Sequence, residues 1–253
     1  MTEIELEDKE CVSFTVSGDW AHFRRIDTTN DKQTYRVIPR TTASGLIAAM
    51  LGLPRDSYYD VFSKDSSAMS VELSSEVRTM QVPMLTLPTS EGDITTAENV
   101  SGKTLIKSEE ERKRRSFEYL CEPEYRIHTV LEDEEVREQL KDRVGVEDGN
   151  PQPVYTPALG KTECLAEISD ATKTEVGRIG EASEIDSVVP EDRIQPKESV
   201  SYSLERSPGY MTADENGRKT TEFVSYAYPT DGGSIEVSGI EAYSVGESEV
   251  CFY

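Results

Sequence analysis

The sequence is poor in histidine and cysteine, the residues that supply most metal ligands in proteins. It contains two histidines and four cysteines, and the cysteines are far apart, with no CxxC pair. Structural zinc sites need closely spaced pairs of such ligands. We therefore expect no metal and no other cofactor, and we expect the cysteines to be buried thiols in a reducing compartment.

Long apolar runs are also missing. No window approaches the roughly 18 uninterrupted apolar residues of a membrane helix. The first residues, MTEIELEDKE, are acidic where a signal peptide would be basic and then apolar. We expect a cytoplasmic protein with no membrane partner. With 253 residues, of which 36% are hydrophobic and 30% charged, the chain can bury a sizeable core beneath a highly charged surface.

Positive charge is in the minority. The chain has 49 acidic and 27 basic residues, which gives a net charge of −22. Such a balance ordinarily argues against a nucleic-acid partner, because phosphate repels carboxylates. An acidic coat with more arginine than lysine also suits a halophilic protein, since in multimolar salt the Debye length falls to about 3 Å or less. The informative segments are then those that are not negative.

Two segments stand out from this acidic background. Residues 18–55 carry six basic and three acidic side chains. The second segment is the RKRR run at residues 112–115, which follows three consecutive glutamates. Residues 18–55 give the clearer signal, because a solvated charged face explains the second segment equally well.

The two histidines are the candidates for a general base at neutral pH. His128 lies at an alternating position in a predicted strand, which favours a structural role. His22 lies in GDWAHFRR and could contact phosphate or act as a general base, although packing is the simpler interpretation. The sequence has neither a GxxxxGK[ST] loop nor an HExxH motif.

The segment FRRIDTTNDKQTYRVIPRTTASG has the features of a phosphate-binding site. It places adjacent arginines, aromatic residues and hydroxyls just before a predicted helix start, where exposed backbone amides attract anions. Arginine also makes forked contacts with phosphate oxygens. The predicted RNA-binding residues are Arg24, Arg25, Tyr35, Arg36, Arg40, Thr41, Thr42 and Ser44. Trp20, Phe23 and Tyr35 are candidates for stacking on unpaired bases, with burial in the core as the equal alternative.

Hydrophobic periodicity predicts strands and helices in the order βαββαβ. Alternating runs indicate the strands, and apolar residues at helical spacing indicate the helices. The predicted strands are residues 11–17, 77–87, 124–131 and either 164–168 or 174–179, and the predicted helices run from Thr41 or Thr42 to Leu51 and from residue 132 to 144. This order predicts an α+β fold with a ferredoxin-like, RRM-like unit.

Two segments fall outside that unit. Residues 89–116 are polar and partly basic and join two predicted strands, which indicates an extended hairpin or a mobile arm. Beyond Pro196 the chain has short alternating runs separated by glycine or proline, which are typical of a small β-rich appendage. We therefore divide the chain into a main domain, residues 1–179, and residues 180–253, which begin with an acidic connection.

Residues 14–54 resemble the N-terminal signature of a known family. The strand, the arginine-containing loop, the PRTT sequence and the GLIAAMLG sequence occur here in the order found in the Cas-five family, the RAMP-type subunit of type I CRISPR Cascade complexes. Further on, VYTPALGKTECLAEI is similar to the family's PxLG segment. The resemblance covers at least the N-terminal two thirds of the chain.

The resemblance implies an RRM-like fold with a thumb-like insertion, here about residues 89–116. It also implies an antiviral, non-catalytic role in binding the 5′ handle of CRISPR RNA (crRNA). The implied protein partners are the repeated backbone subunit, of the Cas-seven family, and the large PAM-reading subunit, of the Cas-eight family. The composition resembles a haloarchaeal type I-B member. The thumb residues that would face RNA or a neighbouring subunit are Lys107, Arg112, Lys113, Arg114 and Arg115.

Two other readings of the sequence stay open. In type I-C systems the corresponding protein cuts repeat RNA with tyrosine, lysine and histidine, so a metal-independent endoribonuclease with His22 as its base is one alternative. Tyr35 lies in the matching neighbourhood, but we find no matching Lys–His pair. The other alternative is an unrelated RRM-like RNA-binding protein, although no segment fits the [KR]-G-[FY]-[GA]-[FY] pattern of such domains.

Overall fold

The structure is a computed structural model of the 253-residue chain. It describes residues 3–25, 31–86, 94–98, 104–108, 113–194, 202–215 and 217–253. The fold is mixed α and β and is dominated by strands. The described residues form two helices, α1 (Arg40–Leu51) and α2 (Glu134–Val144). Among the described residues, neither helix is long and apolar enough to cross a membrane.

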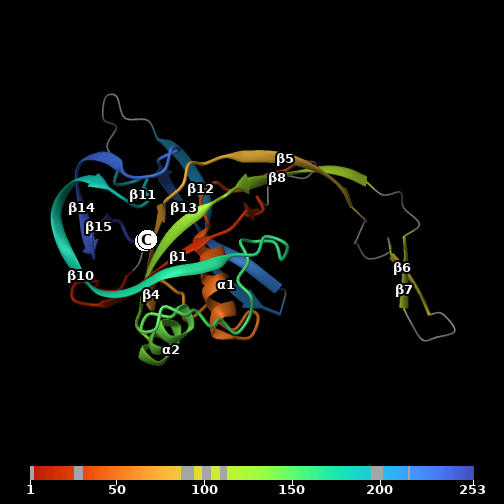
Figure 1. The fold of residues 1–253 in the computed structure, drawn as a ribbon, viewed down its shortest axis with the longest axis horizontal. Helices are drawn as coiled ribbons and strands as arrows, with labels where there is room; N and C mark the ends of the chain where they lie inside the picture. The colour runs from red at the N-terminus through yellow and green to blue at the C-terminus, as the bar shows by residue number, and fades with distance from the viewer. Residues whose placement is uncertain are drawn as a thin grey trace.

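A six-stranded antiparallel sheet forms the centre of the molecule (Figure 1). Its strands in spatial order are β15 (Ser248–Val250), β14 (Ile235–Val245), β10 (Glu167–Ile185), β1 (Glu10–Ser17), β9 (Glu124–Leu131) and β4 (Ser67–Leu73). β1 lies in the middle and is buried on both faces. Val12, Phe14 and Val16 pack with α1 and α2 in the main core, whereas Cys11, on the other face, packs with Val130 and Val245. The sheet therefore has apolar contacts on both sides.

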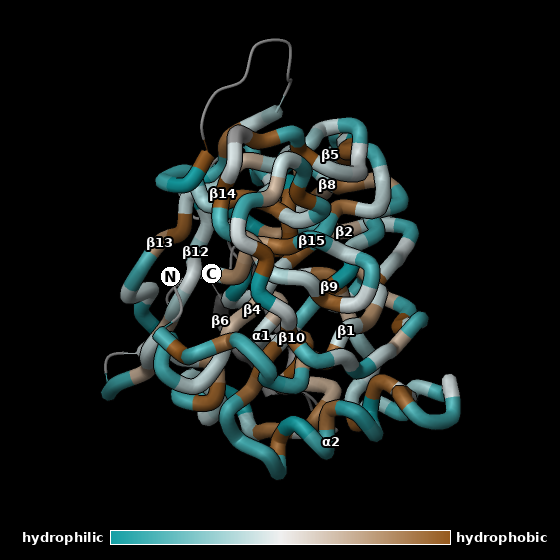
Figure 2. The backbone as a smooth tube through the Cα atoms, turned by 90° about the vertical axis from the view of Figure 1, so that its left-hand side faces the viewer, coloured by the Kyte–Doolittle hydropathy of each residue, from teal (hydrophilic) through white to brown (hydrophobic). Residues whose placement is uncertain are grey.

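A glycine in the left-handed conformation ends each of the two helices. α1 ends at Gly52 and α2 at Gly145, both in the left-handed conformation, with φ angles of 75° and 78°. At its start, α2 has Asp133 as the N-cap, whose carboxylate accepts a hydrogen bond from the backbone N–H of Val136 at 3.1 Å. In Figure 2 the outer turns of α2 are mostly hydrophilic, because only its inner side packs on the sheet.

The first, third and last predicted strands and both predicted helices are confirmed as β1, β9, β10, α1 and α2. The prediction of residues 77–87 as the second strand of the central sheet was wrong. That place is taken by β4, and residues 79–86 form β5, which belongs to another sheet. β4 was missed because serines, Ser67 and Ser70, occupy fully buried positions in it and hide the apolar alternation.

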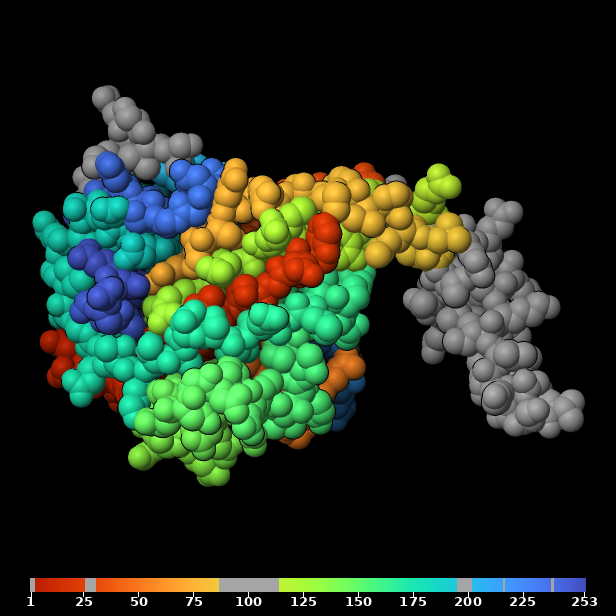
Figure 3. All heavy atoms as spheres, in the orientation of Figure 1, coloured from red at the N-terminus to blue at the C-terminus, as the bar shows by residue number. Residues whose placement is uncertain are grey.

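A long arm leaves the central body (Figures 1 and 3). It consists of β5 (Thr79–Thr86), which pairs antiparallel with β8 (Lys113–Cys121), and of the β6–β7 hairpin (Ile94–Glu98 and Thr104–Ser108). At the root of the arm, two short strands, β2 (Trp20–Ala21) and β3 (Asp31–Lys32), pair with β8. The predicted insertion at residues 89–116 lies partly outside the described residues, and its described parts are β6, β7 and the start of β8.

The C-terminal strands divide between two sheets. β11 (Val189–Pro190), β13 (Gly217–Tyr228) and β12 (Ser203–Asp214) form a separate sheet in that spatial order, and β12 contacts α1. β14 and β15 instead extend the central sheet beyond β10. The division into residues 1–179 and 180–253 remains a prediction, and its boundary falls within β10.

Candidate nucleic-acid interface

The root of the arm brings the two basic segments of the sequence together. β3 pairs in parallel with Ser116 and Phe117 of β8, which places Lys32 beside the end of the RKRR run. The pKa of Lys32 is lowered by desolvation and by the positive charges of Arg24 and Arg115. Arg24 is exposed at the surface. We call these three residues, Arg24, Lys32 and Arg115, the basic cluster; like charges close together disfavour the protonated form of the lysine.

The other predicted arm residues are only partly visible. Arg114 is exposed on β8, and it faces away from Arg115 because side chains alternate along a strand. Lys107 lies in β7 and Lys113 begins β8. Their side chains, and Arg112 as a whole, lie outside the described residues.

The guanidinium of Arg36 is bound to a carboxylate of the protein itself. Its two terminal nitrogens donate to the carboxylate of Glu118 at 2.8 and 2.9 Å, and one of them also donates to the carbonyl oxygen of Thr34 at 2.8 Å. Burial disfavours the charged form, but hydrogen bonding and charge from Glu118 outweigh it and raise the pKa of Arg36. We therefore correct the prediction: Arg36 fixes the segment that precedes α1 to β8.

Arg40 is buried, with 1% of its surface exposed. Its guanidinium donates to the backbone oxygens of Phe62 at 2.7 Å and Tyr253 at 3.2 Å, and to the hydroxyl of Ser67 at 2.7 Å. The ring of Tyr210 lies against it, 4.2 Å from the ring centroid to the guanidinium carbon. The prediction of Arg40 as an RNA contact was wrong, because the protein itself surrounds this charge.

The start of α1 is covered by β12, so the anion site predicted there is closed. Thr41 donates through its hydroxyl to the carbonyl oxygen of Pro208 at 3.4 Å. Ser44 is buried and donates to the carbonyl oxygen of Arg40 at 2.9 Å, one turn earlier. Thr42 is half-buried on the same turn. The hydroxyls of Thr41 and Ser44 are therefore bound within the protein and do not form a phosphate cradle.

A carboxylate of the protein occupies the amides just before α1. Glu205, on β12, accepts hydrogen bonds from the backbone N–H groups of Arg36 at 2.9 Å and Val37 at 3.2 Å. Burial raises the pKa of Glu205, and the two amides and the charge of Arg36 oppose that shift. The amides that the sequence suggested for phosphate are therefore already bound to an internal anion.

Of the three aromatic candidates for base stacking, only Trp20 is exposed. Phe23 and Tyr35 are 2% and 5% exposed and belong to the main core. Arg25 is half-buried, with its guanidinium over the ring of Tyr35, 5.4 Å from the centroid. Trp20 is 38% exposed. The predicted stacking role of Tyr35 was wrong, since its ring is enclosed by the protein.

His22 is too deeply placed to serve an RNA substrate as a base. It is 2% exposed, its ring lies against Phe117 and Tyr119 with centroids 5.6 and 5.4 Å away, and its Nδ1 is 2.7 Å from the carbonyl oxygen of Glu118. Desolvation lowers the pKa of His22, and the positive charge of Lys161 adds to this effect. The Nζ of Lys161 donates to the hydroxyl of Tyr119 at 2.9 Å, so histidine, tyrosine and lysine do come together here. The tyrosine and lysine of this group were missed because they lie on β8 and a distant loop.

His128 lies in the interior of the central sheet. Its Nδ1 is 2.8 Å from the hydroxyl of Ser13, and its Nε2 is 2.6 Å from the carboxylate of Glu72. The order Ser13, His128, Glu72 resembles a catalytic triad of nucleophile, base and acid. Ser13 and His128 are each 1% exposed, however, so no substrate reaches them. The predicted structural role of His128 fits this linkage of β1, β9 and β4.

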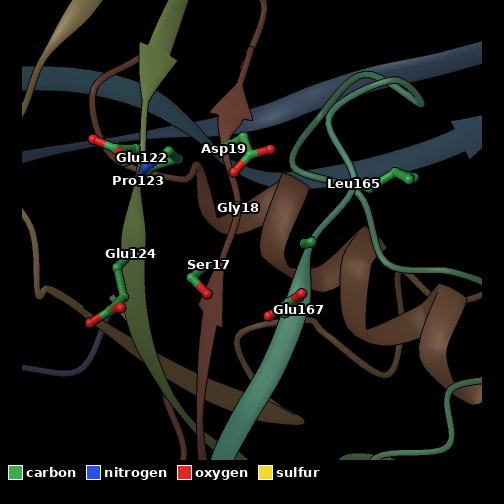
Figure 4. A pocket seen from close by; sticks show the side chains of 9 residues that line it. Ser17, Gly18, Asp19, Glu122, Pro123, Glu124, Leu165 and Glu167 are labelled. Carbon is green, nitrogen blue, oxygen red and sulfur yellow. The ribbon is translucent and has the colours of Figure 1, made fainter.

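A hollow beside β1 has the wrong charge for phosphate. It has a volume of about 390 Å³ and lies where β1 ends and where β9 and β10 begin (Figure 4). Its acidic lining residues are Asp19, Glu122, Glu124 and Glu167. Within the described part of the chain, no three histidine, cysteine or acidic side chains are grouped as metal ligands. The basic cluster is therefore the better candidate for an RNA contact.

Comparison with protein families and solved structures gives consistent matches. The family model described as CRISPR-associated protein (Cas_Cas5) matches residues 11–232. The crystal structure of a CRISPR protein from Archaeoglobus fulgidus is 16% identical, covers 95% of this chain and 98% of its own, and has a TM-score of 0.54, which shows a shared fold. No curated protein matches.

Two weaker structural matches have TM-scores below 0.5. One is titled as a CRISPR RNA-guided surveillance complex, with 12% identity, 92% of this chain and 91% of that chain covered, and a TM-score of 0.45. The other is a type III-B Cmr-beta complex bound to target RNA, with 9% identity, coverage of 90% and 86%, and a TM-score of 0.44.

Proposed function

This chain belongs to the CRISPR-associated protein (Cas_Cas5) family, and we propose that it is a non-catalytic subunit of an antiviral CRISPR surveillance complex that binds the 5′ handle of crRNA. The observation that carries the proposal is the basic cluster at the root of the arm. Arg24 and Lys32 come from one basic segment of the sequence and Arg115 from the other, and the fold gathers them. A chain with a net charge of −22 would repel RNA over most of its surface, so such a local exception indicates where RNA binds.

The topology supports an RRM-like role in this proposal. We propose that β1, α1, β4, β9, α2 and β10 form the ferredoxin-like unit, in which the four strands have the spatial order β10-β1-β9-β4. The arm is then the thumb, and it would contact RNA or the Cas-seven and Cas-eight subunits of a Cascade complex. Assignment to a haloarchaeal type I-B system remains a prediction.

Burial of His22 favours a binding role over cleavage. Metal-independent RNA cleavage needs a base within hydrogen-bond reach of the attacking hydroxyl. His22 is 2% exposed, although Tyr119 and Lys161 lie beside it. If the protein cut RNA through this group, repeat RNA incubated with the pure protein would be shortened, and His22→Ala would abolish the products.

The proposal is tested by the RNA that the protein retains. The tagged chain is purified from its host at native salt, and the RNA that accompanies it is sequenced. We expect intact guide RNAs that share one 5′ handle, together with other complex subunits. The double variant Arg24→Ala/Arg115→Ala should bind handle RNA at least about tenfold more weakly, because each charge-assisted contact contributes about 1.5 to 3 kcal/mol.

A matched control removes the same charge elsewhere. Arg55 and Arg178 have side chains that are 75% and 57% exposed and are paired with surface carboxylates, so Arg55→Ala/Arg178→Ala should leave RNA binding unchanged. Equal retention of handle RNA by the two double variants, or recovery of a broad cellular RNA population, would contradict the proposal.

A further inference from the structure

One face of the arm root carries an apolar groove. The groove has a volume of about 350 Å³, and its lining is almost entirely apolar. Its residues come from four separate parts of the chain: β2, β5, β8 and the loop before β10. The lining residues are Trp20, Met80, Val82, Met84, Tyr119 and Cys164, with Glu163 at the edge. We call this surface the Trp20 groove.

The strand register places these side chains on one face. Met80 lies opposite Tyr119 and Val82 opposite Phe117 in the antiparallel β5–β8 pair, and directly opposed residues share a face. Both Trp20 and Met80 remain well exposed, at 38% and 43%. An apolar surface that a protein leaves open at a rigid β ribbon is a candidate contact site.

The aromatic rings in the groove are held in fixed positions. The rings of Trp20 and Tyr119 meet edge to face, with centroids 6.3 Å apart and planes at 84°. The hydroxyl of Tyr119 accepts a hydrogen bond from Lys161 at 2.9 Å and lies 3.2 Å from a carboxylate oxygen of Glu163. Lys161 and Glu163 also form an ion pair, so they largely neutralise each other. A flat ring that enters the groove therefore meets a preformed aromatic surface.

The same face continues into the basic cluster. Arg115 lies opposite Met84, the next position along the row that begins with Met80 and Val82. Lys32 is paired with Phe117 on the other side of β8, so it also lies on this face. The apolar groove thus passes directly into positive charge. An apolar protein side chain would fill the groove, but it has no anion for these cations.

We propose that the Trp20 groove holds one unpaired nucleobase of single-stranded RNA, stacked on an aromatic ring, while the adjoining phosphate lies at Arg115 and Lys32. A nucleotide joins a flat ring with apolar faces to an anion, and this face offers the two matching surfaces side by side. The inference rests on the proposed RNA-binding function and names the groove where a base is taken up.

Trp20 allows a direct test, because it is the only tryptophan in the chain. The probe is a dye-labelled single-stranded RNA with the sequence of the 5′ handle, titrated into the full chain at native salt. Anisotropy of the dye reports binding, and tryptophan fluorescence reports occupation of the groove. We expect binding to quench Trp20, and an abasic site at one particular position of the RNA to abolish the quenching.

Substitutions separate the groove from the rest of the RNA site. Trp20→Ala should weaken RNA binding roughly 5- to 150-fold, the range for loss of one stacked base, whereas Trp20→Phe should largely retain it. Leu85 lies on β5 but on the opposite face and is 59% exposed, so Leu85→Ala is the matched control and should bind normally. Circular dichroism verifies that each variant is folded.

The failures of the inference and of the proposed function look different. If RNA binds while Trp20 fluorescence and the affinity of Trp20→Ala stay unchanged, the groove holds no base, although the protein still binds RNA. If Trp20→Ala releases a protein subunit from the purified complex but retains the RNA, the groove binds a protein side chain and the inference is wrong. If neither the chain nor its complex binds handle RNA, the proposed function fails first.

Discussion

Arg40 combines a positive charge with deep burial. Its hydrogen bonds go to the backbone oxygens of Phe62 and Tyr253 and to the hydroxyl of Ser67. Desolvation lowers its pKa, and the rings of Tyr210 and Tyr253 oppose that shift. The planar guanidinium is suited to this place because it can donate to several separated acceptors at once.

Replacement of Arg40 should therefore destabilise the fold strongly. We expect Arg40→Leu to lower the free energy of unfolding by about 3 to 5 kcal/mol, since buried acceptors left without a donor cost about 1 to 3 kcal/mol each. Urea unfolding followed by circular dichroism measures this. Arg55→Ala, at a side chain that is 75% exposed, is the control and should change stability by less than about 0.5 kcal/mol.

The same variants decide whether Arg40 also contacts RNA. Arg40→Lys keeps the charge but can reach fewer acceptors, so it should be destabilised to an intermediate degree and should bind RNA normally at temperatures where it is folded. A stable Arg40→Lys protein with lost RNA binding would restore the direct contact that the sequence suggested.

Among the elements, the β12–β13 hairpin is attached to the segment just before α1 by a buried carboxylate, in addition to the contacts of Thr41 and Arg40 with β12. Glu205 is 8% exposed and binds two backbone N–H groups that precede the helix. The hydroxyl of Tyr226, on β13, also lies 3.4 Å from it. The hairpin thereby closes one end of α1, and its docking depends on the charge state of Glu205.

The pH dependence of stability should reveal this carboxylate. Burial raises the pKa of Glu205 above its usual value of 4.5, so between the two values the folded protein binds more protons than the unfolded chain. This contribution to stability is present at low pH and is lost as the pH rises through the raised pKa. We expect Glu205→Gln to gain stability relative to the wild type across that interval and to hold a constant difference above it.

Glu222, on the same hairpin, has a pKa that is shifted in the opposite direction from that of Glu205. Its hydrogen bond and ion pair with Lys64 lower its pKa, so its contribution is lost as the pH falls. Glu222→Gln should therefore gain relative to the wild type as the medium becomes more acidic. Urea midpoints between pH 4 and 8 measure both differences, and parallel curves for wild type and Glu205→Gln would show that Glu205 is not perturbed by burial.

Local patterns were enough to predict some elements and not others. β1, β9 and α2 follow from alternating or helical spacing, and Gly52 and Gly145 mark the helix ends. β4 could not be found in this way, because serines at buried positions interrupt its apolar alternation. The alternation in β5 is real, and Val82 and Met84 pack against the main core and also line the Trp20 groove, but β5 belongs to a different sheet from β1.

The site residues show where sequence reasoning stops. Arg24 and Arg115 were identified from local charge, and both lie close enough to Lys32 to lower its pKa. Arg36 and Arg40 looked equally suitable, but their partners Glu118 and Tyr253 are 82 and 213 residues away. A sequence shows that an arginine is present, whereas only the fold shows whether another part of the chain has already bound it.

For the whole molecule, added salt should raise stability, because of the net charge of −22, and should weaken RNA binding at the small basic cluster. Added salt screens repulsion between carboxylates, so the urea midpoint should rise between about 0.1 and 1 M KCl, where the Debye length falls from about 10 to 3 Å. RNA affinity should fall with a log–log slope of about −2, as expected for three cations that contact single-stranded RNA.

Arg115→Ala should reduce the steepness of that slope by about 0.7, the value for one lost phosphate contact. Glu134→Gln, on the exposed side of α2, should leave the slope unchanged. An RNA affinity that does not vary with salt would mean that the cluster does not contact phosphate.

On the ribosome, this protein cannot fold in the order in which its strands are made. β1 must wait for β9 and β10, and the guanidinium of Arg40 is 213 residues ahead of the carbonyl oxygen of Tyr253 that it binds. At about 5 to 20 residues per second, that wait lasts roughly 10 to 40 s. During it the apolar faces of β1 and α1 have no complete cover, so the nascent chain exposes apolar surface to which chaperones can bind.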